Sequence, residues 1–68
     1  MEEQRIAVGF KGGALMVGMS PRFLELAARD PDRTRRLKTV RIAKRRLIRV
    51  EDLRDWFNRV AREESEAA

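Results

Sequence analysis

A run of three cations, Lys44, Arg45 and Arg46, is the part of this chain with the clearest chemistry. Apolar residues alternate with arginine on both sides of it, at 40–42 and 47–50, which is typical of two short β-strands. These strands and a turn at 43–46 predict a hairpin with the three cations at its tip. Neighbouring cations repel one another unless an anion lies between them, so phosphate is the expected ligand.

The distribution of charge also indicates an anionic partner. The chain has 16 Lys and Arg residues against 11 Asp and Glu residues, a net charge of +5. Eleven of the basic residues and three of the acidic ones lie at 20–49, whereas 50–68 carries three arginines and six acids. Positive charge gathered in one part of a small domain is typical of nucleic-acid binding. The alternative is an arginine-rich surface that serves solubility or thermal stability.

The composition argues against catalysis. The chain has no histidine, cysteine or tyrosine, Ser20 is better explained as a helix cap, and Asp30 and Asp32 flank a proline as in a turn. No carboxylate cluster or ligand spacing suggests a metal. We therefore expect neither an enzyme nor a bound cofactor. No apolar run approaches the roughly 18 residues of a membrane span and no signal peptide is recognisable, so a cytoplasmic protein is expected.

Two short helices are predicted ahead of the hairpin. Apolar residues at 10, 14 and 17 have helical spacing, and Gly18 follows as a terminator, although Gly12 and Gly13 weaken this helix or let another backbone approach it. Ser20 and Pro21 are a strong start for a second helix, which should run to about residue 29. Before these helices, 6–8 is either a short strand or an extended lead, and 1–5 is expected to be poorly ordered.

The second helix should place some residues inward and others outward. Leu24, Ala27 and Ala28 are predicted to face the core. The segment that follows, 30–38, is polar except for Leu37, which we expect to anchor it to the core. The residues expected to be solvated, or to face phosphate, are Arg33, Arg35, Arg36 and Lys38.

The chain should end in an amphipathic helix. Glu51 and Asp52 place negative charge in its first turn, where the helix dipole favours it. Apolar residues at 53, 56, 57 and 60 then follow at helical spacing. This spacing makes core packing of Trp56 a better interpretation than base stacking. The helix is expected to fray after Arg62, where the sequence becomes acidic and small.

In order, these elements are a helix, a turn, a helix, a basic hairpin and a helix. With VGMSPR at 17–22, VRIAKRRLIRVEDL at 40–53 and WF at 56–57, the chain resembles the small winged helix-turn-helix proteins of the excisionase and MerR-like group over roughly 8–60. The resemblance implies a single domain, mainly α with a small β-hairpin, with an ordered core at about 6–62. It also implies that the second helix enters the major groove while the hairpin follows the phosphates or reaches the minor groove.

The same resemblance implies which residues touch DNA. The chain departs from that group at the hairpin turn, which usually starts with glycine and here starts with Ala43. The implied contacts in the recognition helix are Ser20, Arg22, Phe23, Leu26 and Arg29, and those in the linker and wing are Arg33, Arg35, Arg36, Lys38, Arg41, Lys44, Arg45 and Arg46.

Four functions are compatible with the sequence. The first hypothesis is an excisionase-type accessory factor that binds and bends duplex DNA, self-associates on adjacent sites and directs an integrase. A stand-alone MerR-like transcription regulator of the same fold is the alternative. From other classes come a small basic RNA-binding protein and a protein-interaction module that uses the acidic helix at 51–62.

Overall fold

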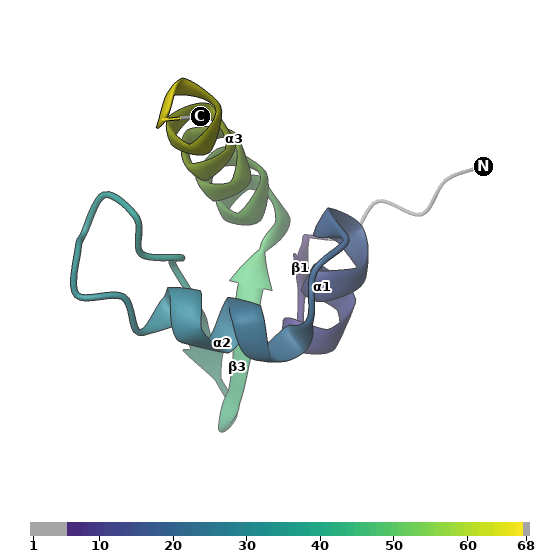
Figure 1. Cartoon of the computed structure of the whole chain (residues 1–68). Coiled ribbons are helices and arrows are strands. Elements are labelled where there is room, and N and C mark those ends of the chain that lie inside the picture. The colour runs from purple at the N-terminus through teal and green to yellow at the C-terminus, as the bar shows by residue number, and fades with distance from the viewer. Residues whose placement is uncertain (1–5, 68) are drawn as a thin grey trace.

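The computed structural model describes residues 6–67, which form three α-helices and a three-stranded antiparallel sheet (Figure 1). The order helix, turn, helix, hairpin, helix agrees with the prediction, and the additional strand makes the fold a mixture of α and β. The predicted disorder of residues 1–5 lies outside the described residues. The elements are β1, Ala7–Val8; α1, Phe10–Val17; α2, Pro21–Ala28; β2, Val40–Ile42; β3, Arg45–Arg49; and α3, Val50–Ala67.

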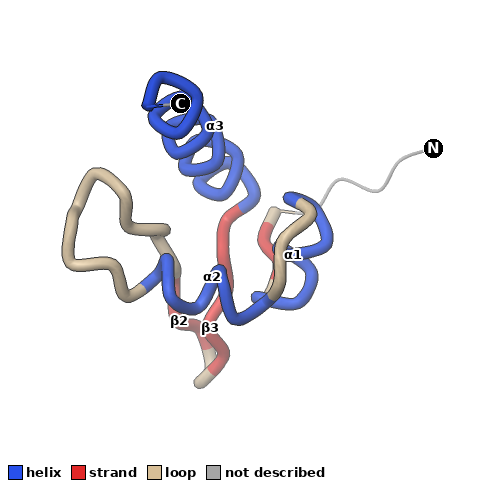
Figure 2. Tube along the Cα trace, viewed as in Figure 1, coloured by secondary structure: helices blue, strands red, loops and turns tan. Residues whose placement is uncertain are grey.

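β3 is the central strand of the sheet, with β1 on one side and β2 on the other (Figure 2). Val8 lies opposite Ile48, and the backbone N–H of Val50 donates to the carbonyl of Ile6 at 2.9 Å. Of the two possibilities left open for residues 6–8, the strand is therefore the one that forms. Val8 and Ile48 are both buried, so they share the face of the sheet that packs against the helices.

α1 has the predicted bounds and ends at the predicted glycine. Gly18 adopts the left-handed conformation, with φ of 74°, and its N–H donates to the carbonyl of Ala14. This helix-terminating geometry costs glycine little because it has no Cβ. Gly13 is buried, and a Cβ built on it would lie 3.2 Å from Cδ1 of both Ile48 and Leu24. The glycine therefore admits the side chains of the core rather than another backbone.

α2 begins as the sequence predicts and ends one residue early. Oγ of Ser20 accepts a hydrogen bond of 3.2 Å from the backbone N–H of Phe23, and Pro21 occupies the first turn. The last helical residue is Ala28. Leu24 is completely buried, as predicted, whereas Ala27 and Ala28 are only partly so.

A hydrophobic core joins the three helices to the sheet. The long loop between α2 and β2 contributes Leu37, which confirms its predicted role as an anchor. Trp56 of α3 is 2% exposed, and its indole N–H donates to the carbonyl of Arg35 at 2.8 Å. Its one polar atom is therefore satisfied inside the protein, as a buried tryptophan requires. The buried apolar residues are Val8, Ala14, Leu24, Leu37, Ile48, Leu53 and Trp56.

α3 is longer than the sequence predicts. Glu51 and Asp52 lie in its first turn as expected. The helix then continues to residue 67, so the prediction that it frays after Arg62 is wrong. The reason is tertiary, since carboxylates near its end are ion-paired with the loop that packs against it. Such pairing offsets part of the conformational entropy lost when the last turns become ordered.

Phe57 is the other departure in this helix. The sequence placed it inward with Trp56, yet its side chain is 41% exposed. Leu53 and Trp56 are buried and Val60 is partly buried, so α3 meets the core along a line through these three residues. Adjacent helical positions differ by about 100° around the axis, and this turns Phe57 away from that line.

Candidate nucleic-acid interface

α2 presents one side to the core and the other to solvent. Arg22 and Leu26 each lie about 160° around the helix from Leu24, Arg29 caps its C-terminal end, and all three are exposed. They form a stripe with two guanidinium groups and one large apolar side chain, here called the α2 stripe. Guanidinium groups pair with the edges of guanine, and apolar side chains contact thymine methyl groups.

The other two residues predicted for this helix make contacts inside the protein. The ring of Phe23 lies 6.4 Å from that of Trp56, centroid to centroid, and is tilted by 58°. Its orientation is therefore towards α3, with part of the ring still exposed. The hydroxyl of Ser20 caps the helix. Of the residues predicted to contact DNA from α2, those of the α2 stripe point outward, as does the carboxylate side chain of Glu25.

The hairpin turns more tightly than the sequence predicts. Ala43 and Lys44 alone form the turn, both in the left-handed region, with φ of 51° and 68°. Arg45 and Arg46 are already part of β3, so the prediction of a turn at 43–46 is wrong. A two-residue turn of this kind matches the right-handed twist of the flanking strands, and pairing of the strands up to the turn compensates for the strain on a non-glycine residue.

The strand register separates the cations by face. Arg41 lies directly opposite Arg46, and we call these two residues the wing pair. Since Arg46 is two residues from buried Ile48, the wing pair lies on the face of the sheet that carries the core. Arg45 lies opposite Ile42 on the outer face. Side chains directly opposite one another start about 4.5–5.5 Å apart at Cβ, so the register places two positive side chains next to each other.

The cations of the hairpin have no counter-charge in the part of the chain that the structure describes. Within residues 6–67, no carboxylate pairs with the wing pair, Lys44 or Arg45. Arg49, at the other end of β3, is different: its guanidinium lies 2.9 Å from Glu51 and 3.8 Å from Asp52. Acidic groups therefore neutralise the end of β3 next to α3 and leave the end next to the turn strongly positive.

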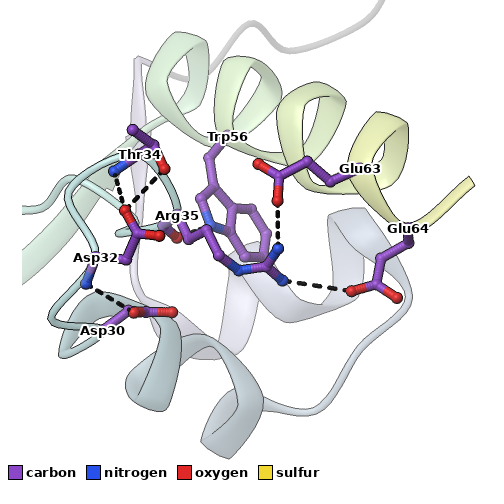
Figure 3. Close-up of polar contacts among 7 residues, drawn as sticks. All are labelled: Asp30, Asp32, Thr34, Arg35, Trp56, Glu63 and Glu64. Atoms are coloured by element: carbon purple, nitrogen blue, oxygen red, sulfur yellow. Dashed lines mark hydrogen bonds and ion pairs between the residues drawn. The ribbon is translucent and has the colours of Figure 1, made fainter. Parts of the chain in front are cut away.

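The loop between α2 and β2 is built on two aspartate turns (Figure 3). Oδ1 of Asp30 accepts from the N–H of Asp32 at 3.0 Å. Oδ1 of Asp32 accepts from the N–H and the hydroxyl of Thr34, at 3.0 and 2.8 Å. Hydrogen bonds from Thr34 stabilise the charged carboxylate and lower the pKa of Asp32. The interpretation of the two aspartates as turn residues is confirmed.

Arg35 ties this loop to α3, which differs from the solvated or phosphate-facing position expected for it. Its Nη1 lies 2.6 Å from Oε1 of Glu63, and its Nη2 lies 3.4 Å from Oε2 of Glu64 (Figure 3). The hydrogen bond and charge of Glu63 raise the pKa of Arg35. The backbone carbonyl of Arg35 also accepts a hydrogen bond from the indole N–H of Trp56. These partners are 21 to 29 residues away in sequence, so no local pattern indicates them.

The remaining basic residues of the loop fall into two kinds. Nε of Arg36 donates to the carbonyl of Asp30 at 2.7 Å, and its Nη2 donates to that of Pro31 at 3.2 Å. Its side chain therefore closes the turn that follows α2. Arg33 and Lys38 are exposed, as the sequence predicts.

One residue near the hairpin turn was not anticipated as part of an interface. Val40 and Ile42 alternate with Arg41, a pattern that predicts a short strand, yet Ile42 is 60% exposed. The strand register places Ile42 on the outer face of the sheet, opposite Arg45 and away from the core. Exposed apolar side chains occur often on protein surfaces, and only the surrounding charge makes this one notable.

Most of the predicted contacts thus lie around α2 and the hairpin. Figure 1 shows the hairpin turn projecting past α2, at the end of β3 away from α3. Ser20, Phe23, Arg35 and Arg36 are engaged in contacts within the protein. The candidate interface consists of Arg22, Leu26, Arg29, Arg33, Lys38, Arg41, Lys44, Arg45 and Arg46.

Within the described part of the chain, no helix is long and apolar enough to cross a membrane. No protein-family model matches the sequence. No curated protein and no solved structure matches it either.

Proposed function

We propose that this chain is a winged helix-turn-helix protein that binds duplex DNA, with α2 in the major groove and the β2–β3 hairpin as the wing. Three residues, 18–20, separate α1 from α2, as in a helix-turn-helix, and the hairpin follows these helices. The observation that carries the proposal is the wing pair. Two arginines held opposite each other, without a carboxylate partner among residues 6–67, are best accommodated by phosphate.

The wing supplies the part of the affinity that does not depend on sequence. The wing pair, Lys44 and Arg45 give four positive charges within a few residues of the turn. Cations of this kind neutralise phosphates and release counterions, so their contribution decreases as salt increases. Arg33 and Lys38 extend the same positive surface into the loop.

The α2 stripe supplies the selection among sequences. Arg22 lies in the first turn of α2, and the N-terminal part of a recognition helix is the part that meets base edges. Its guanidinium would pair with a guanine, and Leu26 would contact a thymine methyl group one turn later. Arg29, at the C-terminal end of the helix, is placed to contact the backbone of the duplex.

The small size of the domain supports a cooperative role. One module of this size buries only roughly 600–1,000 Å² on DNA, so several copies on adjacent sites would be needed for high affinity. We therefore propose an excisionase-type accessory factor that binds and bends DNA to direct an integrase. A stand-alone transcription regulator would use the same interface. A neighbouring integrase gene favours the first role and a divergent promoter favours the second.

Selection from a random duplex library at about physiological salt, followed by gel-shift titration, tests the proposal. Enrichment of a defined site, with weaker binding by Arg22→Ala at that site only, is the expected result. Arg62→Ala is the control, since it removes an exposed arginine from α3, outside the interface. Absence of any enriched site, or tighter binding to single-stranded RNA than to duplex DNA at equal salt, would refute the proposal.

A further inference from the structure

One side of α3, next to its core-facing side, carries an ordered set of residues. Arg54, Phe57, Ala61 and Glu64 recur at alternating spacings of three and four residues, the spacing of a seam between two packed helices. Arg54, Phe57 and Glu64 are exposed, the last with 70% of its side chain accessible, and Ala61 is partly so. We call these four residues the α3 seam.

The surroundings of Phe57 suit contact with another apolar surface. Phe57 separates two surface hollows, one of which contains Met16 and the other Met19. Both methionines are exposed, and their flexible side chains adapt to the shape of a partner. Phe57 and these methionines thus place partly exposed apolar surface along the seam.

The order of charges along the seam is self-complementary. Arg54 lies towards the N-terminal end of α3 and Glu64 towards its C-terminal end, with Phe57 and Ala61 between them. Each pair, 54 with 64 and 57 with 61, is symmetric about position 59. When two such helices pack antiparallel about a two-fold axis at that level, each Arg54 faces the partner's Glu64 and each Phe57 faces the partner's Ala61. A parallel arrangement would place like charges together.

We infer that the α3 seam is the contact through which two copies of this chain associate as an antiparallel, two-fold symmetric pair. Arg54 forms no ion pair within residues 6–67, so its charge is available to a partner. Glu64 makes the longer of the two contacts to Arg35, 3.4 Å against 2.6 Å for Glu63, so it can accept a second cation while Glu63 keeps the loop in place.

The pair leaves the candidate DNA-binding surface accessible. The hairpin turn lies at the end of β3 away from α3, as Figure 1 shows. One helix crossing with its flanking methionines is smaller than the roughly 1,200 Å² of a standard interface, so the association should depend on concentration. It forms without DNA and does not rest on the proposed function. If both copies bind one duplex, their half-sites are inverted relative to each other.

Sedimentation equilibrium of the full chain, from dilute to millimolar protein, tests this inference. Wild-type protein should dimerise reversibly. Arg54→Glu and Glu64→Arg should each raise the dissociation constant of the dimer by about tenfold or more, because the two-fold axis makes each repulsive contact occur twice. The double variant restores opposite charges and should recover most of the affinity. Arg62→Glu is the matched control: it makes the same charge change on another side of α3 and should leave the dimer intact.

Circular dichroism of each variant separates loss of association from loss of fold. A wild-type chain that stays monomeric at millimolar concentration would refute the second copy as the occupant and leave the seam to a different protein. A dimer that survives both single substitutions, or a folded double variant that fails to recover, would also overturn the inference. None of these outcomes depends on whether the protein binds DNA.

Discussion

Replacing Arg46 by threonine should make the free protein more stable and its DNA complex weaker. Arg46 lies opposite Arg41 in the sheet, and neither has a carboxylate partner among the described residues. Threonine is well suited to a strand, so the change removes the charge without adding a propensity penalty. Arg45→Thr is the matched control for stability, because Arg45 lies opposite Ile42, which carries no charge.

The size of the effect follows from the strand register. Two guanidinium charges about 7 Å apart repel by about 0.6 kcal/mol in water, within the roughly 0.2–1 kcal/mol of cross-strand pairs. A domain of this size changes its Tm by about 4–8 °C per kcal/mol, so Arg46→Thr should raise the Tm by about 2–5 °C at low salt. Loss of one phosphate contact should reduce the slope of log K against log salt by about 0.9.

Thermal unfolding by circular dichroism at low and high salt measures the first effect, and fluorescence anisotropy with a labelled duplex measures the second. Screening should remove the gain in Tm at high salt, because the repulsion is between exposed charges. A decrease in Tm together with weaker binding would mean that Arg46 stabilises the fold, which contradicts the reasoning. An unchanged salt slope would exclude its contact with phosphate.

Three other substitutions test separate parts of the structure. Arg22→Ala should weaken DNA binding by about 1–3 kcal/mol at one preferred base pair, which titration of duplexes that differ at single positions would measure. An equal loss of affinity on every duplex would mean that Arg22 contacts phosphate instead. Gly13→Leu should destabilise the protein by about 1–3 kcal/mol in urea unfolding, because a Cβ there already lies 3.2 Å from side-chain atoms of Ile48 and Leu24. Unchanged stability would mean that these side chains move aside without a cost in free energy. Because folding lowers the pKa of Asp32, its contribution to stability is complete above the ordinary value of 3.8 and is lost as pH falls through the lower folded value. Asp32→Asn should therefore lose less stability than wild type when the pH falls below about 4. The same loss in both proteins would contradict the role of the hydrogen bonds from Thr34.

The predictions that the structure confirms rest on interactions between residues close in sequence. The start of α2 follows from Ser20 and Pro21, and the end of α1 follows from Gly18, because caps and terminators act within one turn. Burial of Leu37 and Trp56 was also predictable, since a large apolar side chain in a polar or amphipathic context has few other places to go. The exposed side of α2 followed from helical periodicity in the same way.

The predictions that failed depended on contacts between distant segments. The register of β2 and β3 shortened the turn to Ala43 and Lys44 and placed Arg46 against Arg41, a pairing that the run of cations does not reveal. Arg35 could not be recognised as the residue that holds the loop against α3, because its carboxylate partners are 28 and 29 residues further along.

For this protein, the sequence by itself determined the order of the helices and the hairpin, the cap that starts α2, the glycine that ends α1 and which part of the chain is positive. Only the tertiary structure decided which cations are neutralised within the protein and which remain available to a ligand. The same is true of Phe57, whose exposure depends on how α3 meets the core. The physical reason is range: capping and periodicity act within a few residues, whereas ion pairing and burial depend on which distant segments the fold brings together.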